Sequence, residues 1–356
     1  MTDVTDLAAR VVDGEHRALA RAISVVEDRR EGYRDLVSRL HDHAGDARAI
    51  GLTGAPGSGK STLVDKLAAE YRERGHTVGV IAIDPSSPFT GGAVLGDRIR
   101  MASNVGDMDV FVRSMSARGN LGGLSAATTD AITALDAFGK DRILIETVGA
   151  GQNEVDVVRA ADTIAVLVPP GAGDNVQMLK AGILEIGDVF VVNKADLEGA
   201  DRTVQELREM IELNRGKPAP TVGHHGPEHL RMEEAADGDD DTDWTPEIVE
   251  TVATRGEGID DFIRTVDDHH EFMLSSGHLA EKRRLRRAEE VRTLLREDVN
   301  GLIEAELERH GGLDALVDDV LAGDADPYGV ADRVLAPLVD RLTREEADPG
   351  EPTADD

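Results

Sequence analysis

The 356-residue sequence predicts an α/β fold: a doubly wound, mostly parallel sheet of the P-loop class with helical extensions at both ends. Short β-rich runs alternate with longer helical stretches between residues 48 and 194, which is typical of parallel strands connected by helices. The segment GAPGSGKS follows the first run and precedes a helical stretch, and the segment NKAD ends the last run. Both segments occupy strand ends, where open parallel sheets bind their ligands.

The N-terminal residues 1–45 are expected to form a helical arm. Between residues 5 and 41 apolar side chains recur at roughly helical spacing among charged ones, which indicates amphipathic helices packed on a larger body. These apolar positions are Leu7, Val11, Leu19, Ile23, Val26, Leu36 and Leu40.

The P-loop domain is predicted over residues 46–272. Its strands, in chain order, are expected at AIGLTG, VGVIAID, DVFVR, RILIETVG, TIAVLV, VFVVNK and EIVETVAT, with a helix from about Ile259 after the last of them. The stretch 224–244 is acidic and rich in turn residues, so we expect a solvated insertion loop. Its histidines His224, His225 and His229 leave a metal site open as an alternative.

The C-terminal arm is predicted over residues 273–345, followed by a disordered acidic tail at 346–356. One long helix, from 276 to 309, carries an apolar stripe at steps of three or four residues, and shorter helices follow at 313–322 and 327–344. The stripe comprises Leu285, Ala288, Val291, Leu295, Val299 and Leu302. The basic cluster EKRRLRR in the long helix is either a solvated face or a contact to an acidic surface.

Composition narrows the functional class. Hydrophobic residues make up 40% of the chain, which is enough for a core. The formal charge of −31 disfavours binding to nucleic acid and to anionic lipid and favours solubility where salt screens self-repulsion. We interpret it as halophilic adaptation to a salty cytoplasm, with an acidic partner-binding surface as the alternative. The absence of cysteine excludes disulfides and thiolate chemistry.

No targeting segment is recognisable. The N-terminus carries acidic residues where a signal peptide needs basic ones, and no apolar run approaches eighteen residues. We therefore expect a cytoplasmic protein that binds neither membranes nor nucleic acid.

The spacing of GAPGSGKS matches G-x-x-x-x-G-K-[ST], a loop whose backbone N–H groups bind phosphates. Its lysine reaches the β and γ phosphates, and its hydroxyl ligates Mg²⁺. A glycine-rich turn without a ligand is the alternative. The predicted nucleotide-binding residues of this loop are Gly54, Ala55, Pro56, Gly57, Ser58, Gly59, Lys60, Ser61 and Thr62.

The NKAD segment selects the base. The carboxylate of Asp196 can accept hydrogen bonds from N1–H and the 2-amino group of guanine, whereas adenine offers no donor at N1, so we expect GTP and GDP rather than ATP. Lys194 is expected along the base, and Asn193 is expected to tie this loop to the P-loop. A backbone N–H at the Val252-Ala253 step is expected to meet the guanine O6, although an ordinary strand end explains that step equally well.

Acidic residues follow two strands beside the P-loop. Asp84, Asp97 and Glu146 are predicted to hold Mg²⁺, directly or through its waters, or to orient the attacking water. Together with Lys60 they are the predicted catalytic residues. Gly149 is expected to contact the γ-phosphate through its N–H. Helix capping is the alternative for the carboxylates, above all for Asp84.

In this order, GAPGSGKS, DPSSPFTGGAVLGDRIRM, ETVGAGQNE, PPGAGDNVQMLKAG and NKAD resemble the GTPase chaperones of adenosylcobalamin-dependent methylmalonyl-CoA mutase, over residues 1 to about 340. The family was formerly described as amino-acid transport kinases. The resemblance implies an acidic switch cluster at Asp84, Asp97 and Glu146. It also implies a partner-sensing switch loop at 168–180 and a homodimer through the helices after 275; packing of those helices on the N-terminal arm is the alternative to the dimer. Within 168–180, Asp174 and Lys180 bracket a short expected helix, and we expect both to exchange partners across an interface when the γ-phosphate leaves. A static loop in which Asp174 caps that helix is the alternative. Val252 stands where the family usually has serine, and the 224–244 insertion is unusually acidic.

Three other functions remain open at this point. A nickel-insertion GTPase of the same structural class would need metal-binding His or Cys runs. A transport kinase or ATPase would need ATP, which Asp196 disfavours. A binding module without hydrolysis would keep the same nucleotide motifs.

Overall fold

The computed structural model describes residues 3–84, 107–116, 121–147, 160–171, 186–214 and 244–346. Seven strands in these residues form one sheet, and every neighbouring pair is parallel. The order is β3-β2-β4-β1-β5-β6-β7. The strands are β1 Arg48–Gly54, β2 Val78–Asp84, β3 Val110–Ser116, β4 Arg142–Thr147, β5 Thr163–Val168, β6 Val189–Asn193 and β7 Glu247–Thr251. All seven were predicted from their β-rich runs, so the parallel α/β fold is confirmed.

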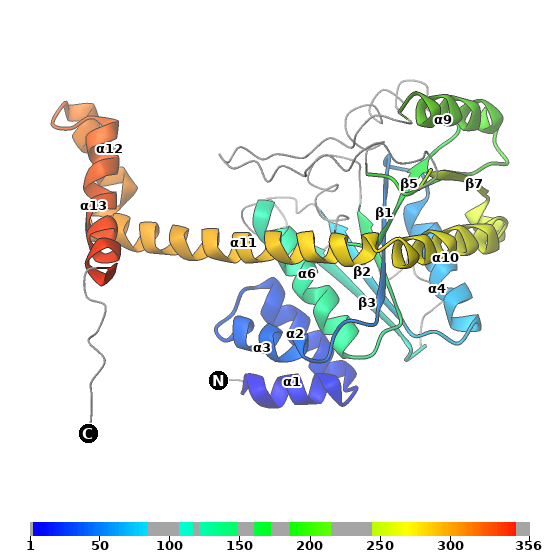
Figure 1. The fold of residues 1–356 in the computed structure, drawn as a ribbon, viewed down its shortest axis with the longest axis horizontal. Helices are drawn as coiled ribbons and strands as arrows, with labels where there is room; N and C mark the ends of the chain where they lie inside the picture. Colours follow the sequence, from blue (N-terminus) through cyan, green and yellow to red (C-terminus); the bar gives the residue numbers. More distant parts are fainter. Residues whose placement is uncertain are drawn as a thin grey trace. The chain divides into compact units, whose positions relative to one another are not determined.

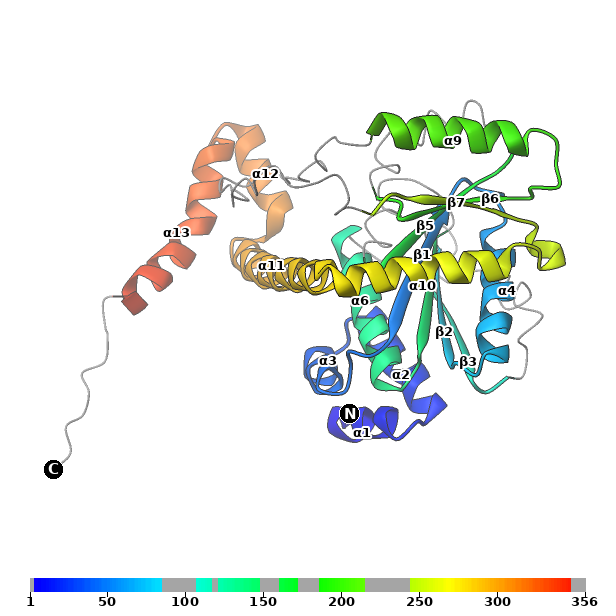
Figure 2. The ribbon, with the colours of Figure 1, turned by 45° about the vertical axis from the view of Figure 1, so that its right-hand side comes forward.

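Helices cover both faces of the sheet, as Figures 1 and 2 show. On one face, α4 (Lys60–Glu73) and α10 (Ile259–Ser275) pack on apolar side chains of the central strands. On the other face, α6 (Leu121–Ala137) packs near β2 and β4, and α9 (Ala200–Asn214) packs on β5 and β6. Alternate residues of one strand serve the two faces: Val191 faces α10, and Phe190 faces α9. Burial on both faces explains the unbroken apolar run of β6.

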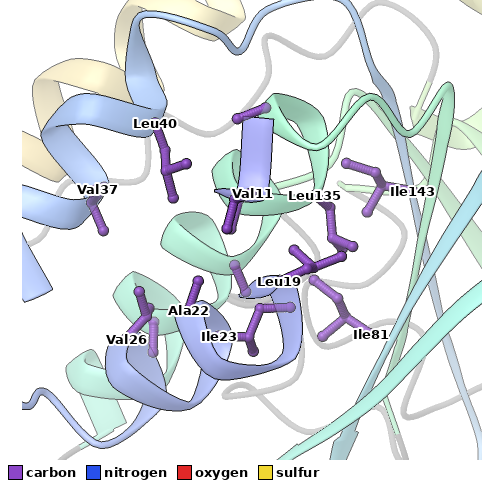
Figure 3. Packing of buried hydrophobic residues seen from close by; sticks show 14 of the residues in the cluster. Val11, Leu19, Ala22, Ile23, Val26, Val37, Leu40, Ile81, Leu135 and Ile143 are labelled. Atoms are coloured by element: carbon purple, nitrogen blue, oxygen red, sulfur yellow. The ribbon is translucent and has the colours of Figure 1, made fainter. Parts of the chain in front are cut away.

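Three helices precede the sheet: α1 (Val4–Val12), α2 (His16–Glu27) and α3 (Tyr33–His41). The first begins where Asp3 Oδ1 accepts the N–H of Thr5 at 2.9 Å, a helix N-cap. All seven apolar positions singled out in this arm are buried, at most 1% exposed. They belong to one buried cluster with Leu135 of α6 and with Ile81 and Ile143 of the sheet, part of which Figure 3 shows. The amphipathic helices predicted for this segment therefore pack on the P-loop domain as expected.

The chain divides into two compact units, residues 1–284 and 285–356. The boundary falls within α11 (His278–Arg309), which is followed by α12 (Gly312–Ala322) and α13 (Pro327–Glu346). Within the described part of the second unit, Leu316 and Val334 are the buried apolar side chains. The predicted stripe on α11 is largely exposed: Leu285, Val291, Leu295, Val299 and Leu302 are each 53–60% exposed.

Two residues of the basic cluster at the start of α11, Lys282 and Arg283, meet acidic groups of the first unit. Lys282 Nζ donates to the carbonyl of Asp162 at 2.8 Å and lies 3.6 Å from the carboxylate of Asp188. Arg283 lies 3.5 Å from the Asp162 carboxylate. Of the two explanations for this cluster, the contact to an acidic surface therefore holds for these two residues.

The insertion at 224–243, with its three histidines, and the tail from 347 lie outside the described residues. None of the described helices is long and apolar enough to cross a membrane.

Candidate nucleotide-binding site

The P-loop connects the carboxyl end of β1 to the first residue of α4. Gly54 and Gly59 have φ angles of 138° and 93°, a backbone region that favours glycine. A Cβ at Gly54 would collide with the carbonyl of Leu167 in β5, and a Cβ at Gly59 would collide with the side-chain amide of Asn193. The two outer glycines of the motif are therefore required both by backbone conformation and by close neighbours. The loop ends at a helix N-terminus, which favours anions.

A pocket of about 630 Å³ lies on this loop. Its lining comprises Pro56, Gly57, Gly59, Lys60, Ser61, Thr62 and Glu146. Six of these seven belong to the predicted phosphate loop, and the seventh is a predicted switch carboxylate.

Lys60 is nearly buried, at 5% exposed. Its ammonium donates to the carbonyls of Gly54 at 2.8 Å and Ala55 at 3.0 Å. The positive charge therefore lies inside the loop, against the pocket wall, where a phosphate oxygen would meet it.

Ser61 and Glu146 meet in the lining of the pocket. Ser61 Oγ donates to Glu146 Oε1 at 2.5 Å, and the Glu146 side chain comes from β4, the strand next to β1. Glu146 is 8% exposed. Hydroxyl and carboxylate oxygens are the hard ligands that Mg²⁺ prefers, so the two side chains fit this ion.

Asn193 joins three segments of the site. At the end of β6, its Nδ2 donates to the carbonyl of Ser58 at 2.8 Å, and its Oδ1 accepts from Thr251 Oγ1 at 3.1 Å and Ala253 N–H at 3.2 Å. The residue is 2% exposed. The structure therefore agrees with the expected tie between the NKAD segment and the P-loop, and it adds a connection to the end of β7.

Lys194 and Asp196 flank the same corner. Lys194 has a φ of 63°, which is uncommon for a residue with a side chain, and its Nζ donates to the carbonyl of Gly57 at 2.8 Å. Asp196 is 31% exposed, and its Oδ2 accepts from Arg255 Nη2 at 3.1 Å.

The backbone donors at the Val252-Ala253 step are already engaged. Val252 N–H donates to the carbonyl of Glu257 at 3.0 Å, and Ala253 N–H donates to Asn193. A guanine O6 contact from either group would require one of these bonds to be exchanged.

The structure describes less of the remaining predicted residues. Asp84 ends β2, the strand that pairs with β4 beside Glu146. Asp97, Gly149, Asp174 and Lys180 lie outside the described residues. Within the described ranges, no group of three His, Cys, Asp or Glu side chains converges on a metal position.

Sequence reasoning missed two participants of this site. Thr251 is 1% exposed and donates to Asn193, and Arg255 pairs with Asp196. Thr251 was detectable only as the end of a predicted strand, and Arg255 only as a basic residue in a turn. Neither feature of the sequence indicates which residue Thr251 or Arg255 contacts, since each partner lies about 60 positions earlier in the chain.

Comparison with known proteins places this site in a family. The family model "Methylmalonyl Co-A mutase-associated GTPase MeaB" matches residues 19–308. A Pyrococcus horikoshii protein named "Putative GTPase" is 46% identical over 341 residues, which cover 96% of this chain and all of that protein. The mouse "Methylmalonic aciduria type A homolog, mitochondrial" is 31% identical, covering 93% of this chain and 79% of that protein.

A solved structure shows the same fold. The crystal structure of an LAO/AO transport system kinase aligns with a TM-score of 0.63 and 22% sequence identity, covering 95% of this chain and 99% of that one. With its P-loop, its NKAD corner and these relatives, the chain belongs to the family of methylmalonyl-CoA mutase-associated GTPases and is a GTP-hydrolysing P-loop enzyme.

Proposed function

We propose that this GTPase gates the loading of cobalamin cofactor into an adenosylcobalamin-dependent methylmalonyl-CoA mutase and protects that enzyme. The observation that carries the proposal is the complete nucleotide corner formed by the P-loop, Asn193 and Asp196 in a chain of the mutase-associated family. In this proposal GTP hydrolysis sets the timing of cofactor loading, and the mutase is the partner that responds to the nucleotide state. The charge and the family together favour a cytoplasmic site of action.

The nucleotide is proposed to bind through the P-loop and the NKAD corner. Backbone N–H groups of residues 54–62 and the N-terminus of α4 bind the phosphates, and Lys60 neutralises their charge. Asp196 accepts the N1–H and 2-amino donors of guanine, while Lys194 lies along the base. Calorimetry with GDP and ADP tests this arrangement: we expect GDP to bind at least 100-fold more tightly, and equal affinities would contradict it.

Magnesium is proposed to bind beside Ser61. The Ser61 hydroxyl and the carboxylate of Glu146 are within 2.5 Å of each other at the pocket wall, and Asp84 and Asp97 are proposed to complete the acidic cluster. When bound, the ion neutralises charge on the phosphates. The Ser61 hydroxyl holds the Glu146 carboxylate in the pocket lining, and we propose that from there it acts on the bound Mg²⁺ or on the attacking water.

The link to the mutase is proposed to run through residues 168–180. β5 ends at Val168, and the carbonyl of Leu167 lies against Gly54 of the P-loop. A segment that leaves the sheet at this point is adjacent to the phosphates. Asp174 and Lys180 in it are proposed to exchange partners across the interface when the γ-phosphate leaves.

GTP turnover with and without the holo-mutase tests the link. We expect the mutase to stimulate hydrolysis by the unmodified protein. Lys180→Ala should keep the intrinsic rate and lose most of the stimulation, because a partner accelerates turnover only through contacts that differ between states. Lys66→Ala, a lysine of α4 outside the pocket lining, is the matched control. Full stimulation in both Lys180→Ala and Asp174→Ala would exclude this segment as the coupling element.

The C-terminal helices are proposed to form a homodimer. Within the described part of residues 285–346, eleven large apolar side chains are exposed against two that are buried. Exposed apolar side chains in this number favour an interaction site, and a second copy of the same stripe is the simplest symmetric cover.

Light scattering in high salt tests the homodimer. We expect a dimer at micromolar concentration and a monomer for Leu295→Glu, which places a charge in the stripe. Asn300→Glu adds the same charge at an exposed position of α11 outside the stripe and should remain dimeric. A monomer in the unmodified protein would contradict the proposal.

A further inference from the structure

Arg255 pairs with the carboxylate of Asp196, the group that the proposed function assigns to guanine recognition. Its Nη2 lies 3.1 Å from Asp196 Oδ2, as both a hydrogen bond and an ion pair. The sequence motif does not require an arginine here, and no role for it follows from phosphate binding. We propose that Arg255 is an intramolecular competitor of the guanine base, which weakens guanine-nucleotide binding and thereby speeds release. The proposal rests on the proposed role of Asp196 as the guanine acceptor.

The backbone fixes Arg255 next to Asp196. Arg255 is the last residue of the 3₁₀ turn η2 (Ala253–Arg255), and its N–H donates to the carbonyl of Val252 at 2.8 Å. The same turn is tied to the NKAD corner by the bond from Ala253 N–H to Asn193. Asn193 therefore ties the NKAD segment, which carries Asp196, to the turn η2, which carries Arg255. The Asp196–Arg255 ion pair forms between these two connected backbone segments.

A second carboxylate offers Arg255 an alternative partner. Glu257 Oε1 lies 3.9 Å from Nη1, the other terminal nitrogen of the same guanidinium. The Val252–Glu257 bridge holds the backbones of these two positions side by side. When a base takes over Asp196, the guanidinium can turn toward Glu257 without leaving its charge unpaired, so the exchange costs little.

The chemistry makes the competition specific for guanine. Guanine brings two donors, N1–H and the 2-amino group, to the carboxylate and so needs both of its oxygens, one of which, Oδ2, already accepts from Arg255. Adenine has an acceptor at N1 and gains nothing from displacing Arg255. The competitor therefore penalises guanine nucleotides and leaves the weak binding of adenine nucleotides unchanged.

The size of the penalty follows from exposure. Asp196 and Arg255 are 31% and 57% exposed, so their pair has the strength of a surface ion pair. Removing it corresponds to roughly a two- to five-fold change in an equilibrium constant. Salt screens such a pair, so the effect should shrink as the ionic strength rises.

Calorimetric titration of the full chain with Mg²⁺-GDP tests the inference. We expect Arg255→Ala to lower the Kd for GDP about two- to five-fold at low salt, with a smaller change in high salt and no change for ADP. Arg264→Ala removes the same charge from another exposed ion pair, with Asp261, and controls for the change in net charge. Glu257→Gln, which removes the alternative partner, should raise the Kd for GDP. Unchanged melting curves establish that the variants are folded, and Arg255→Gln serves as a second truncation.

Weaker GDP binding by Arg255→Ala, or a Kd equal to that of Arg264→Ala, would overturn the inference. Asp196→Asn separates this failure from that of the proposed function. If Asp196→Asn weakens GDP binding while Arg255→Ala does not tighten it, the competitor is excluded and the guanine acceptor stands. If Asp196→Asn leaves GDP binding unchanged, the acceptor assignment fails, and the inference fails with it.

Discussion

Replacing Asn193 by alanine should destabilise the whole nucleotide corner. The side chain is 2% exposed and makes three hydrogen bonds, to the carbonyl of Ser58, the hydroxyl of Thr251 and the N–H of Ala253. These partners belong to the P-loop, to β7 and to η2. Alanine at position 193 removes the side-chain partner of the Ser58 carbonyl, the Thr251 hydroxyl and the Ala253 N–H, at a position that is closed to solvent.

The magnitude follows from the three partners. A buried polar group that loses its partner costs about 1–3 kcal/mol. A water molecule can enter the space left by the amide and bridge part of the set, so we expect about 3–5 kcal/mol in the free energy of unfolding. The unit that holds the site spans residues 1–284, and for a unit of that size this free energy corresponds to a fall in the thermal midpoint of roughly 5–8 °C.

Differential scanning calorimetry of the nucleotide-free protein measures this fall. Thr251→Val removes one of the three bonds and should cost about 1 kcal/mol. Asn193→Asp keeps the acceptor oxygen but places a carboxylate against the Ser58 carbonyl, so it should rank near the alanine variant. A midpoint for Asn193→Ala within 1 °C of the unmodified protein would refute the view that this amide holds the site together.

Two further predictions concern the pocket, and a third concerns His269 of α10, which is 1% exposed and has its Nδ1 2.9 Å from the hydroxyl of Thr163 in β5. Lys60→Ala should abolish tight GTP binding, measured by calorimetry, because it removes the charge that faces the phosphates; affinity within a factor of ten of the unmodified protein would count against it. Glu146→Gln should lower the single-turnover rate of GTP hydrolysis and change its Mg²⁺ dependence while leaving GDP binding nearly intact, and an unchanged rate would remove Glu146 from the catalytic group. Burial lowers the pKa of His269 below its ordinary value of 6.5, so the unfolded chain takes up a proton before the folded one does. The contribution of neutral His269 to the free energy of unfolding is fully present above about pH 6.5 and is lost as the pH falls toward the lowered pKa. His269→Gln should therefore make the melting temperature depend less on pH between pH 7 and 5. Parallel plots of melting temperature against pH for the variant and the unmodified protein would contradict this.

The strands were predictable because each one is a short run of β-branched and apolar residues that the sheet buries on one or both faces. The P-loop, Asn193 and Glu146 were predictable because phosphate binding at a strand end requires particular residue types at fixed spacing. The structure places their side chains around one pocket or one corner. Their chemical roles remain predictions that the variants above test.

Contacts between distant segments were not predictable. Arg255 meets Asp196 only because β6 and β7 are neighbours in the sheet, an arrangement that local spacing does not encode. In the same way, the sequence left two interpretations of the basic cluster at the start of α11, a solvated helix face and a contact to an acidic surface. The sequence could not show that Lys282 lies against Asp162 and Asp188, which precede β5 and β6.

The most direct test of the proposed function is affinity isolation of the full-length chain from its native cell, with GTP and Mg²⁺ present throughout. The account predicts that an adenosylcobalamin-dependent acyl-CoA mutase is recovered with the unmodified protein and is depleted when Lys60→Ala, which we expect to lose tight GTP binding, is used instead. Recovery of no such mutase, or equal recovery with both proteins, would contradict a nucleotide-gated chaperone of that enzyme.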